Sequence, residues 1–290
     1  MNKQRGILYA FLAVILYATI GFGFKIAVTN VNPFIATVYI GLFATLFLGV
    51  YLAIKGKLKD VIKEFKKNKL FFIIAGFIGL GLQQILYLKS FSLLPASNVV
   101  ILFYLYPIFM IFISGLFFKH KISIKSILLL FIGFIGVYIL ISKGSLIIPI
   151  LSLGTILAIL ASLSWAFFSV LIKYKKFEVE SGMFLFNLFG LISLLLMIPW
   201  FGFDFKISTT AIIGLVYLGI FPTAIAFLFW NKALKSTNLS TCSNIALLTP
   251  LLSILLISII LGEKLVPTLI VSLVLIVGSV YLNLRFEKNK

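Results

Sequence analysis

The sequence predicts an all-α integral membrane protein, with ten transmembrane helices arranged as two inverted five-helix repeats around a central cavity. Three observations support this fold class: the composition is very apolar, ten long uncharged runs follow one another, and part of the first half reappears in the second. Hydrophobic residues make up 62% of the 290 residues and charged residues 11%. Soluble domains are about 45–50% apolar and about 25% charged, so we expect this chain to lie in lipid.

The uncharged runs are expected to be helices rather than strands of a barrel. Every backbone polar group in lipid must be satisfied, which leaves helices and closed barrels. Barrel strands alternate polar and apolar residues over about ten positions, whereas these runs are continuously apolar. A spanning helix needs about 20 mostly apolar residues, so each run allows one helix. The runs are residues 6–24, 26–54, 70–88, 90–118, 126–142, 144–172, 181–203, 207–231, 236–262 and 265–284.

The first run follows Lys3 and Arg5 and therefore also has the composition of a signal peptide. We expect a retained first helix, because a shift of 148 residues relates this run to the sixth one. That shift pairs Gly6 with Gly154, Ala10 with Ala158, Ala13 with Ala161, Ala18 with Ala166 and Lys25 with Lys173. Cleavage would leave the sixth helix without its counterpart. In the second run, Asn32 and Pro33 mark a loop before the helix begins.

The internal repeat is clearest between residues 87–121 and 230–264, which a single shift of 143 residues superimposes without a gap. The informative pairs are Lys89 with Lys232, Ser97 with Ser240, Pro107 with Pro250 and Lys121 with Lys264. A period of nearly half the chain indicates duplication of a multi-helix unit. We expect a first repeat at residues 1–143, a linker at 144–149, and a second repeat with a short cytoplasmic tail at 150–290.

The distribution of basic residues predicts the orientation, since Lys and Arg accumulate on the cytoplasmic side. With a cytoplasmic N-terminus, 20 of the 25 Lys and Arg residues fall inside, and the others fall outside. Those outside are Lys25, Lys89, Lys143, Lys206 and Lys264. We therefore expect a multi-pass protein of the cytoplasmic membrane with both termini cytoplasmic. Five helices per repeat is an odd number, so the second repeat should be inverted, the plan used for alternating access.

Several partners and activities are not expected. The net charge of +18 comes from basic residues between apolar runs, not on a soluble face, which argues against nucleic acid as a partner. One His and seven scattered carboxylates argue against a metal site or an intramembrane enzyme, so we expect no catalytic residue and no cofactor. The expected partners are the lipid bilayer and a small-molecule solute. Ten helices suffice for a cavity, so one copy is enough and a dimer is allowed.

The chain resembles the EamA-type branch of the drug/metabolite transporter superfamily. The resemblance rests on ten helices in two repeats, each with a Lys near the end of its first helix, and on a shared stretch in each fourth helix. That stretch reads Ser97, Pro107 and His120-Lys121 in the first half, and Ser240, Pro250 and Glu263-Lys264 in the second. The resemblance covers essentially the whole chain. It implies a basket of helices 1–4 and 6–9 around a central cavity, with helices 5 and 10 outside.

The resemblance also implies a secondary transporter for a small amphipathic metabolite, an amino acid or a related compound, with export as the expected direction. Two features depart from the family pattern. His120 stands where the first half usually has an acidic residue, and no Arg follows Pro33 in the second helix. A flippase, or a carrier for a lipid-linked or nucleotide-sugar substrate, has the same fold and stays open. No acidic residue lies in the middle of an expected span, so proton coupling has no positive support.

Polar and aromatic residues within the expected spans are candidates for the solute site. Amides in hydrocarbon should face the protein interior, because an unpaired polar group in lipid is costly. Such residues line a solute path or bond one helix to another. For the basic residues at helix ends, the alternatives are snorkelling to the interface or anchoring an anionic group. The candidates are Tyr17, Lys25, Gln83, Gln84, Tyr87, Lys89, Asn98, Trp165, Asn187, Trp230, Asn231 and Asn244.

Four residues are candidates for hinges or gates. Pro107 and Pro250 lie near the middle of the fourth helix of each half, and Pro222 in the eighth helix corresponds to Gly79 in the third. Proline removes a backbone donor and kinks a helix. Interruptions at matching places in two halves point to a central site, although Pro and Gly also simply shape helix packing in membranes.

Overall fold

The computed structural model describes residues 3–27, 31–118, 123–147, 151–202, 207–262, 264–265 and 267–288. These residues form helices and no strand, and ten of the helices are long and apolar enough to cross a membrane. We number them as spans 1 to 10: Lys3–Phe24, Pro33–Ile54, Lys69–Phe91, Ala96–Phe118, Ile124–Ser142, Leu153–Tyr174, Val179–Leu196, Thr209–Ser236, Leu239–Leu261 and Leu269–Glu287. The predicted all-α fold with ten transmembrane helices is confirmed.

Several spans contain more than one helical segment. The first half consists of α1 (Lys3–Ala18), α2 (Ile20–Ala27), α3 (Pro33–Ile54), α4 (Leu58–Lys67), α5 (Lys69–Gly76), η1 (Phe77–Leu82), α6 (Gln83–Phe91), α7 (Ala96–Phe103), α8 (Tyr106–Phe118) and α9 (Ile124–Ser142). The second half consists of α10 (Leu153–Tyr174), α11 (Val179–Leu196), α12 (Ile198–Phe201), α13 (Thr209–Leu218), η2 (Gly219–Ile225), α14 (Ala226–Ser236), α15 (Leu239–Ala246), α16 (Leu248–Leu261) and α17 (Leu269–Lys288). The linker expected at 144–149 falls between α9 and α10, where residues 148–150 lie outside the described part.

Polar side chains begin several spans. The Asn32 side chain accepts a hydrogen bond from the backbone N–H of Phe34 at the start of α3, where Pro33 occupies the first turn. Ser152 and Ser208 cap α10 and α13 in the same way. These caps satisfy backbone donors that lack a partner in the first turn of a helix, and proline is well suited to that turn because its missing N–H is not needed there.

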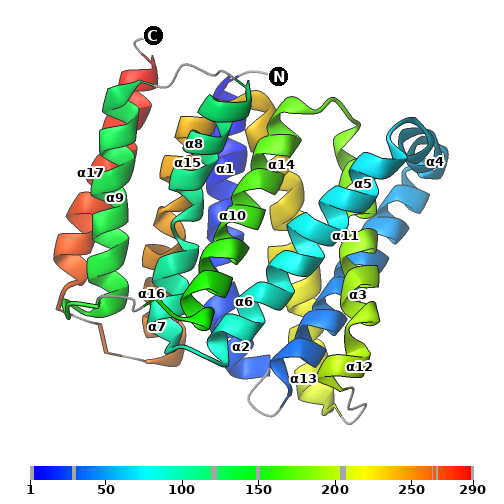
Figure 1. Cartoon of the computed structure of the whole chain (residues 1–290), viewed down its shortest axis with the longest axis horizontal. Coiled ribbons are helices and arrows are strands. Elements are labelled where there is room, and N and C mark those ends of the chain that lie inside the picture. The colour runs from blue at the N-terminus through cyan, green and yellow to red at the C-terminus, as the bar shows by residue number, and fades with distance from the viewer. Residues whose placement is uncertain are drawn as a thin grey trace.

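The packing of the spans repeats between the two halves of the chain. The first span of each half packs on the third span of the other half: α1 contacts α14, and α10 contacts α6. The second span of each half also packs on the third span of the other half, since α3 packs on η2 and α11 packs on η1. The fifth spans, α9 and α17, lie side by side at one edge of the bundle (Figure 1). The start of α1 and the end of α17 lie at the same end of the bundle, which we call the terminal end (Figure 1).

Two glycines allow close approach of backbones at equivalent places. A Cβ atom on Gly76 would lie 3.0 Å from the carbonyl oxygen of Phe186 in α11. A Cβ atom on Gly219 would lie 2.9 Å from the carbonyl oxygen of Ile40 in α3. The two glycines are related by the same shift of 143 residues that superimposes the sequence repeat. Small residues at such crossings let membrane helices pack closely, so a side chain at either position would push two spans apart.

Spans 3 and 8 are interrupted at matching places by short π-helical segments, η1 and η2. Gly79 lies within η1, and Pro222 lies within η2. Proline has no N–H, so the carbonyl of Leu218, four residues earlier, has no α-helical donor. The hydroxyl of Thr223 donates a hydrogen bond of 2.8 Å to that carbonyl. The π-helical register and this side chain together satisfy the backbone around the proline.

Spans 4 and 9 are also broken at matching places. Helix α7 ends at Phe103 and α15 ends at Ala246, and these two residues are again 143 positions apart. Both spans resume as helix just before their proline, Pro107 in α8 and Pro250 in α16. Span 1 is broken too, at Thr19, where the counterpart span, α10, is continuous. The two halves therefore share their interruptions in the third and fourth spans but not in the first.

Helix α4 joins spans 2 and 3 and lies crosswise at the terminal end of the bundle (Figure 1). Its Val61 is buried against the bundle, and the ring of Phe65 stacks on Phe189 with centroids 5.6 Å apart. Its lysines lie on the exposed sides of the helix. This amphipathic pattern suits a helix at the surface of a membrane.

Candidate functional site

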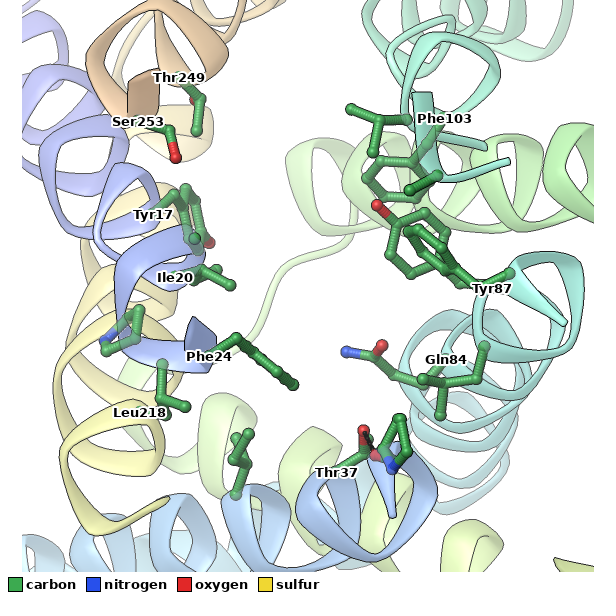
Figure 2. Close-up of a pocket in the computed structure, with 18 of the residues that line it drawn as sticks. Tyr17, Ile20, Phe24, Thr37, Gln84, Tyr87, Phe103, Leu218, Thr249 and Ser253 are labelled. Atoms are coloured by element: carbon green, nitrogen blue, oxygen red, sulfur yellow. Dashed lines mark hydrogen bonds between the residues drawn. The ribbon is translucent and has the colours of Figure 1, made fainter. Parts of the chain in front are cut away.

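A cavity of about 1220 Å³ lies within the bundle and receives side chains from spans 1 to 9. Figure 2 shows its walls: Tyr17 and Ile20 lie on one side, and Tyr87 and Phe103 lie on the opposite side. The volume exceeds the range of about 300–1,000 Å³ that is typical of small-molecule pockets. The cavity is therefore large enough for a small metabolite with surrounding water.

The cavity opens at the end of the bundle opposite the termini. Its lining includes Asn32, Ser92, Lys143 and Lys264, which lie in the connections at that end. Among the described residues, none from the connections at the terminal end belongs to the lining. We call the open end the mouth. In the described part of the chain, the cavity is thus accessible from the mouth and not from the terminal end.

Aromatic rings line the part of the cavity farthest from the mouth. Trp165 packs edge-on against Phe227, with ring centroids 5.0 Å apart and an interplanar angle of 90°. Tyr17 lies 6.0 Å from Phe227 and 6.4 Å from Trp230, measured between ring centroids. The Tyr17 hydroxyl and the Trp230 indole nitrogen are buried and have no hydrogen-bond partner among the described residues. This aromatic cluster therefore presents an apolar surface to the cavity.

Eight of the twelve residues expected at a solute site line this cavity. They are Tyr17, Gln83, Gln84, Tyr87, Lys89, Trp165, Asn187 and Trp230. Gln83 is only 3% exposed, and the amide of Gln84 points into the hollow (Figure 2). Two of the four hinge candidates, Pro222 and Pro250, also line it. The structure therefore brings together residues from both halves that are far apart in the sequence.

The other expected residues lie elsewhere. The side-chain amides of Asn231 and Asn244 are buried, and each donates a hydrogen bond of 3.0 Å to the carbonyl four residues earlier in its own helix. Asn98 accepts a hydrogen bond of 3.4 Å from the Ser97 hydroxyl. The side chain of Lys25 lies outside the described residues. These three amides thus have local partners instead of facing the cavity.

Two of the hinge candidates also lie away from the cavity. A Cβ atom on Gly79 would lie 2.4 Å from the ring of Phe168 in α10, so this glycine lets spans 3 and 6 approach. Pro107 is buried within α8.

Several lining residues were not singled out from the sequence. Thr37, Thr249 and Ser253 supply hydroxyl groups to the wall (Figure 2). Single hydroxyls are common in apolar helices, so the sequence holds no signal that separates these from others. The sequence predicts that Lys143 and Lys264 lie outside the membrane, but their place at the mouth depends on how distant spans pack.

The terminal end is closed by an ionic network around Glu180 in the first turn of span 7. The Lys57 ammonium lies 2.6 Å from Oε2 of Glu180 and 3.5 Å from Oε1 of Glu178. The Tyr51 hydroxyl donates a hydrogen bond of 2.9 Å to Oε1 of Glu180, and the Lys232 ammonium lies 3.9 Å from the same oxygen. The hydrogen-bonded Glu180 carboxylate raises the pKa of Lys57 above its ordinary value. This network links spans 2, 7 and 8.

Further hydrogen bonds close the rest of the terminal end. Lys173, at the end of span 6, donates a hydrogen bond of 2.6 Å to the carbonyl of Thr237, just before span 9. Lys235 donates to the carbonyl of Lys175. At the other side, Asn238 donates a hydrogen bond of 2.6 Å to the carboxylate of Glu287. Polar contacts therefore join the ends of several spans at the terminal end of the bundle.

Comparisons with known proteins agree with this architecture. The model of the EamA-like transporter family matches the chain twice, at residues 4–142 and 152–285. An uncharacterized transporter of Clostridium kluyveri is 25% identical over 306 residues, covering 99% of this chain and 94% of the relative. The uncharacterized transporter YxxF of Bacillus subtilis is 25% identical, covering 91% of this chain and 84% of the relative.

A crystal structure of 20% sequence identity shares the fold, with a TM-score of 0.86 over 96% of both chains. The ten apolar helices, the family match and the named relatives together indicate a multi-pass membrane transporter rather than an enzyme. The chain belongs to the EamA-like transporter family of the drug/metabolite transporter superfamily.

Proposed function

We propose that the chain is a secondary carrier that moves a small amphipathic metabolite, an amino acid or a related compound, out of the cell by alternating access across the cytoplasmic membrane. The observation that carries this proposal is the one-sided cavity, which is open at the mouth and closed at the terminal end by the Glu180 network. With cytoplasmic termini, as the distribution of lysines predicts, this is the outward-open state. A carrier must also adopt the opposite state, in which the mouth is closed.

The lining supports an amphipathic solute. Aromatic rings at the far end of the cavity, such as Trp165 and Phe227, offer an apolar surface to a ring or an aliphatic chain. The amides of Gln83 and Gln84 lie on one wall and can orient a polar group. Binding sites for small molecules commonly combine a mostly apolar surface with a few polar groups that fix orientation.

The repeat suggests which residues line the opposite state. Ser97, Val100 and Phe103 of span 4 line the cavity. Their equivalents 143 residues later, Ser240, Ser243 and Ala246 of span 9, are buried near the terminal end. If the inverted halves exchange conformations, these buried residues face an inward-open cavity. The shared interruptions in spans 3, 4, 8 and 9 supply places where such a change can bend the helices.

The proposal is tested by counterflow in proteoliposomes that contain the purified protein. The vesicles are loaded with a pool of amino acids and small metabolites, and the assay is run with and without a pH gradient. Saturable exchange of one class of solute supports a carrier, and insensitivity to the gradient then supports a facilitator. If the folded, monodisperse protein exchanges no soluble metabolite, the proposed substrate class is wrong.

A matched pair of variants in span 3 connects transport to the cavity. Gln84→Trp places a large ring in the hollow, whereas Ile74→Trp places the same ring on the exposed surface of the same span. We expect the first variant to abolish exchange and the second to retain it. Equal transport activity of the two variants would show that transport does not depend on this cavity.

A carrier or flippase for a lipid-linked solute is the second candidate. A smaller, largely apolar hollow of about 480 Å³ lies beside the cavity and shares Lys89 and Phe201 with it. This hollow offers room for an acyl chain next to a headgroup in the cavity. Exchange of a lipid-linked sugar, without exchange of soluble metabolites, would favour this candidate in the same vesicles.

A further inference from the structure

We propose that the site selects organic anions: solutes with an aromatic or apolar body whose charged group is a carboxylate or another anionic group. This inference rests on the proposed function and names the charge of the solute. The lining holds three basic side chains, Lys89, Lys143 and Lys264, which come from different parts of the fold. Among the described residues, no Asp or Glu belongs to the lining.

The charges of the described residues are separated between the two ends of the protein. The described carboxylates are Asp60, Glu64, Glu178, Glu180 and Glu287, which all lie at the terminal end. Asp204 and Glu263 lie outside the described residues. An ammonium group in the cavity therefore meets no described carboxylate, whereas an anion meets three lysines at the entrance. A cleft lined by one sign of charge concentrates ions of the opposite sign.

The backbone at Lys143 has a conformation that is more usual for glycine. Lys143 follows the last turn of α9 with φ of 54° and ψ of 31°, the left-handed conformation. It is the one non-glycine residue with positive φ in the described part of the chain. Glycine is the residue that usually ends a helix in this conformation, because it has no Cβ to clash. Here a lysine occupies such a position, and its side chain lines the mouth.

Two polar atoms without a partner among the described residues are buried at the far end of the cavity. The indole N–H of Trp230 can only donate, and it has no partner among the described residues. The Tyr17 hydroxyl beside it is likewise without a partner there. Both atoms have almost no exposed surface, so a solute oxygen reaches them only after the surrounding rings rearrange. The selection of anions therefore rests on the lysines at the mouth, and the far end contributes an apolar surface.

The closing experiment compares three compounds that differ in one group: 3-phenylpropionate, its amide, and 3-phenylpropylamine. Binding to the purified full-length protein is followed by quenching of tryptophan fluorescence, since Trp165 and Trp230 line the cavity. We expect the carboxylate to bind about tenfold more tightly than the amide, and the amine to bind most weakly. Added salt should weaken carboxylate binding and leave amide binding unchanged, because the lysines are exposed to solvent.

Variants of Lys143 make the test specific to the mouth. Lys143→Gly removes the charge at a position whose backbone suits glycine, so the variant should fold at least as well as the parent. We expect it to lose part of the preference for the carboxylate over the amide, because Lys89 and Lys264 remain, and Lys143→Arg to keep the whole preference. Lys66→Gln, which removes an exposed lysine of α4 at the terminal end, is the control and should change nothing.

The outcomes separate this inference from the proposed function. Equal or tighter binding of the amine, or an unchanged preference in Lys143→Gly, would overturn the selection of anions. Absence of binding by all three compounds would overturn the proposed aromatic anion class. If the carboxylate is preferred in binding but no compound is exchanged across vesicles, charge selection stands and the carrier proposal fails. If all three are exchanged equally, the carrier stands and charge selection fails.

Discussion

The ammonium of Lys57 lies 2.6 Å from Oε2 of Glu180, and this ion pair joins the segment after span 2 to the first turn of span 7. Glu180 also accepts a hydrogen bond from Tyr51 and lies near Lys232. One carboxylate therefore holds groups from several spans at the terminal end. Opening the cavity toward this end requires these contacts to separate.

We predict that Glu180→Gln shifts the protein toward the state that is open at the terminal end. Partly exposed ion pairs contribute at most about 1 kcal/mol, so the population of that state should rise about fivefold. The readout is maleimide labelling of Ser243→Cys from the terminal end, in a Cys242→Ala background that removes the only native cysteine.

Two controls accompany this experiment. Ser97→Cys at the cavity wall should be labelled from the mouth, and Asp60→Asn removes an exposed carboxylate of α4 without touching the Glu180 network. Because the pKa of Lys57 is raised, the contribution of its ion pair is complete below the ordinary value of 10.5 and is lost only as the pH rises through the raised value. The labelling rate of Ser243→Cys, divided at each pH by the rate for the same cysteine in the unfolded protein to remove the ionisation of the thiol, should therefore be flat between about pH 6 and pH 9. Unchanged labelling in Glu180→Gln would show that the network does not hold the closed end.

We predict that Gly76→Ala and Gly219→Ala each destabilise the protein by about 2 kcal/mol, because the added methyl group meets a backbone carbonyl that cannot rotate away. Thermal unfolding in detergent provides the measurement. Gly278→Ala in α17 is the matched control, since no atom lies within 4 Å of its added methyl. It should be neutral or stabilise by up to about 1 kcal/mol. Similar effects at all three sites would mean that the two close crossings are not tightly packed.

We predict that Thr223→Val costs about 1 kcal/mol of stability, because the Leu218 carbonyl loses its hydroxyl donor beside Pro222. Thr45→Val is the matched control. Its hydroxyl donates a hydrogen bond of 2.7 Å to the Gly41 carbonyl within the continuous helix α3, where a backbone donor serves the same carbonyl. Thermal unfolding of the two variants should show the larger loss for Thr223. An equal loss would mean that the π-helical segment satisfies its own backbone without the threonine.

We predict that fusion tags report cytoplasmic termini. A tag within residues 55–69 or after residue 290 should be cytoplasmic, and a tag near Lys206 should be external. The reason is that most of the Lys and Arg residues fall on the side of the membrane that holds residues 55–69 and both termini, and such residues accumulate on the cytoplasmic side. Protease accessibility in sealed vesicles distinguishes the two sides. A cytoplasmic tag near Lys206, a residue outside the described part of the structure, would reverse the assignment of the mouth to the exterior.

Some details of the structure follow from the sequence because they depend on residues close together in the chain. Pro222 and Gly79 mark corresponding positions in the repeat, and the structure has π-helical segments around both. The positions of Pro107 and Pro250 likewise coincide with breaks in spans 4 and 9. Asn231 and Asn244 show the opposite case. The sequence could not tell a lining amide from one that bonds its own helix, because that depends on the direction in which a face of the helix points.

The sequence by itself determined that the chain has ten apolar helices, since length and hydrophobicity along a run decide whether it can satisfy its backbone in lipid. It also revealed the duplication through the rare Pro, Lys and Ser pairs. Only the tertiary structure decided that Lys89, Lys143 and Lys264 meet at one mouth, that Tyr17 lies beside Trp230, and that the terminal end is closed around Glu180. These relationships join residues from distant spans, so they arise from helix packing rather than from any local pattern.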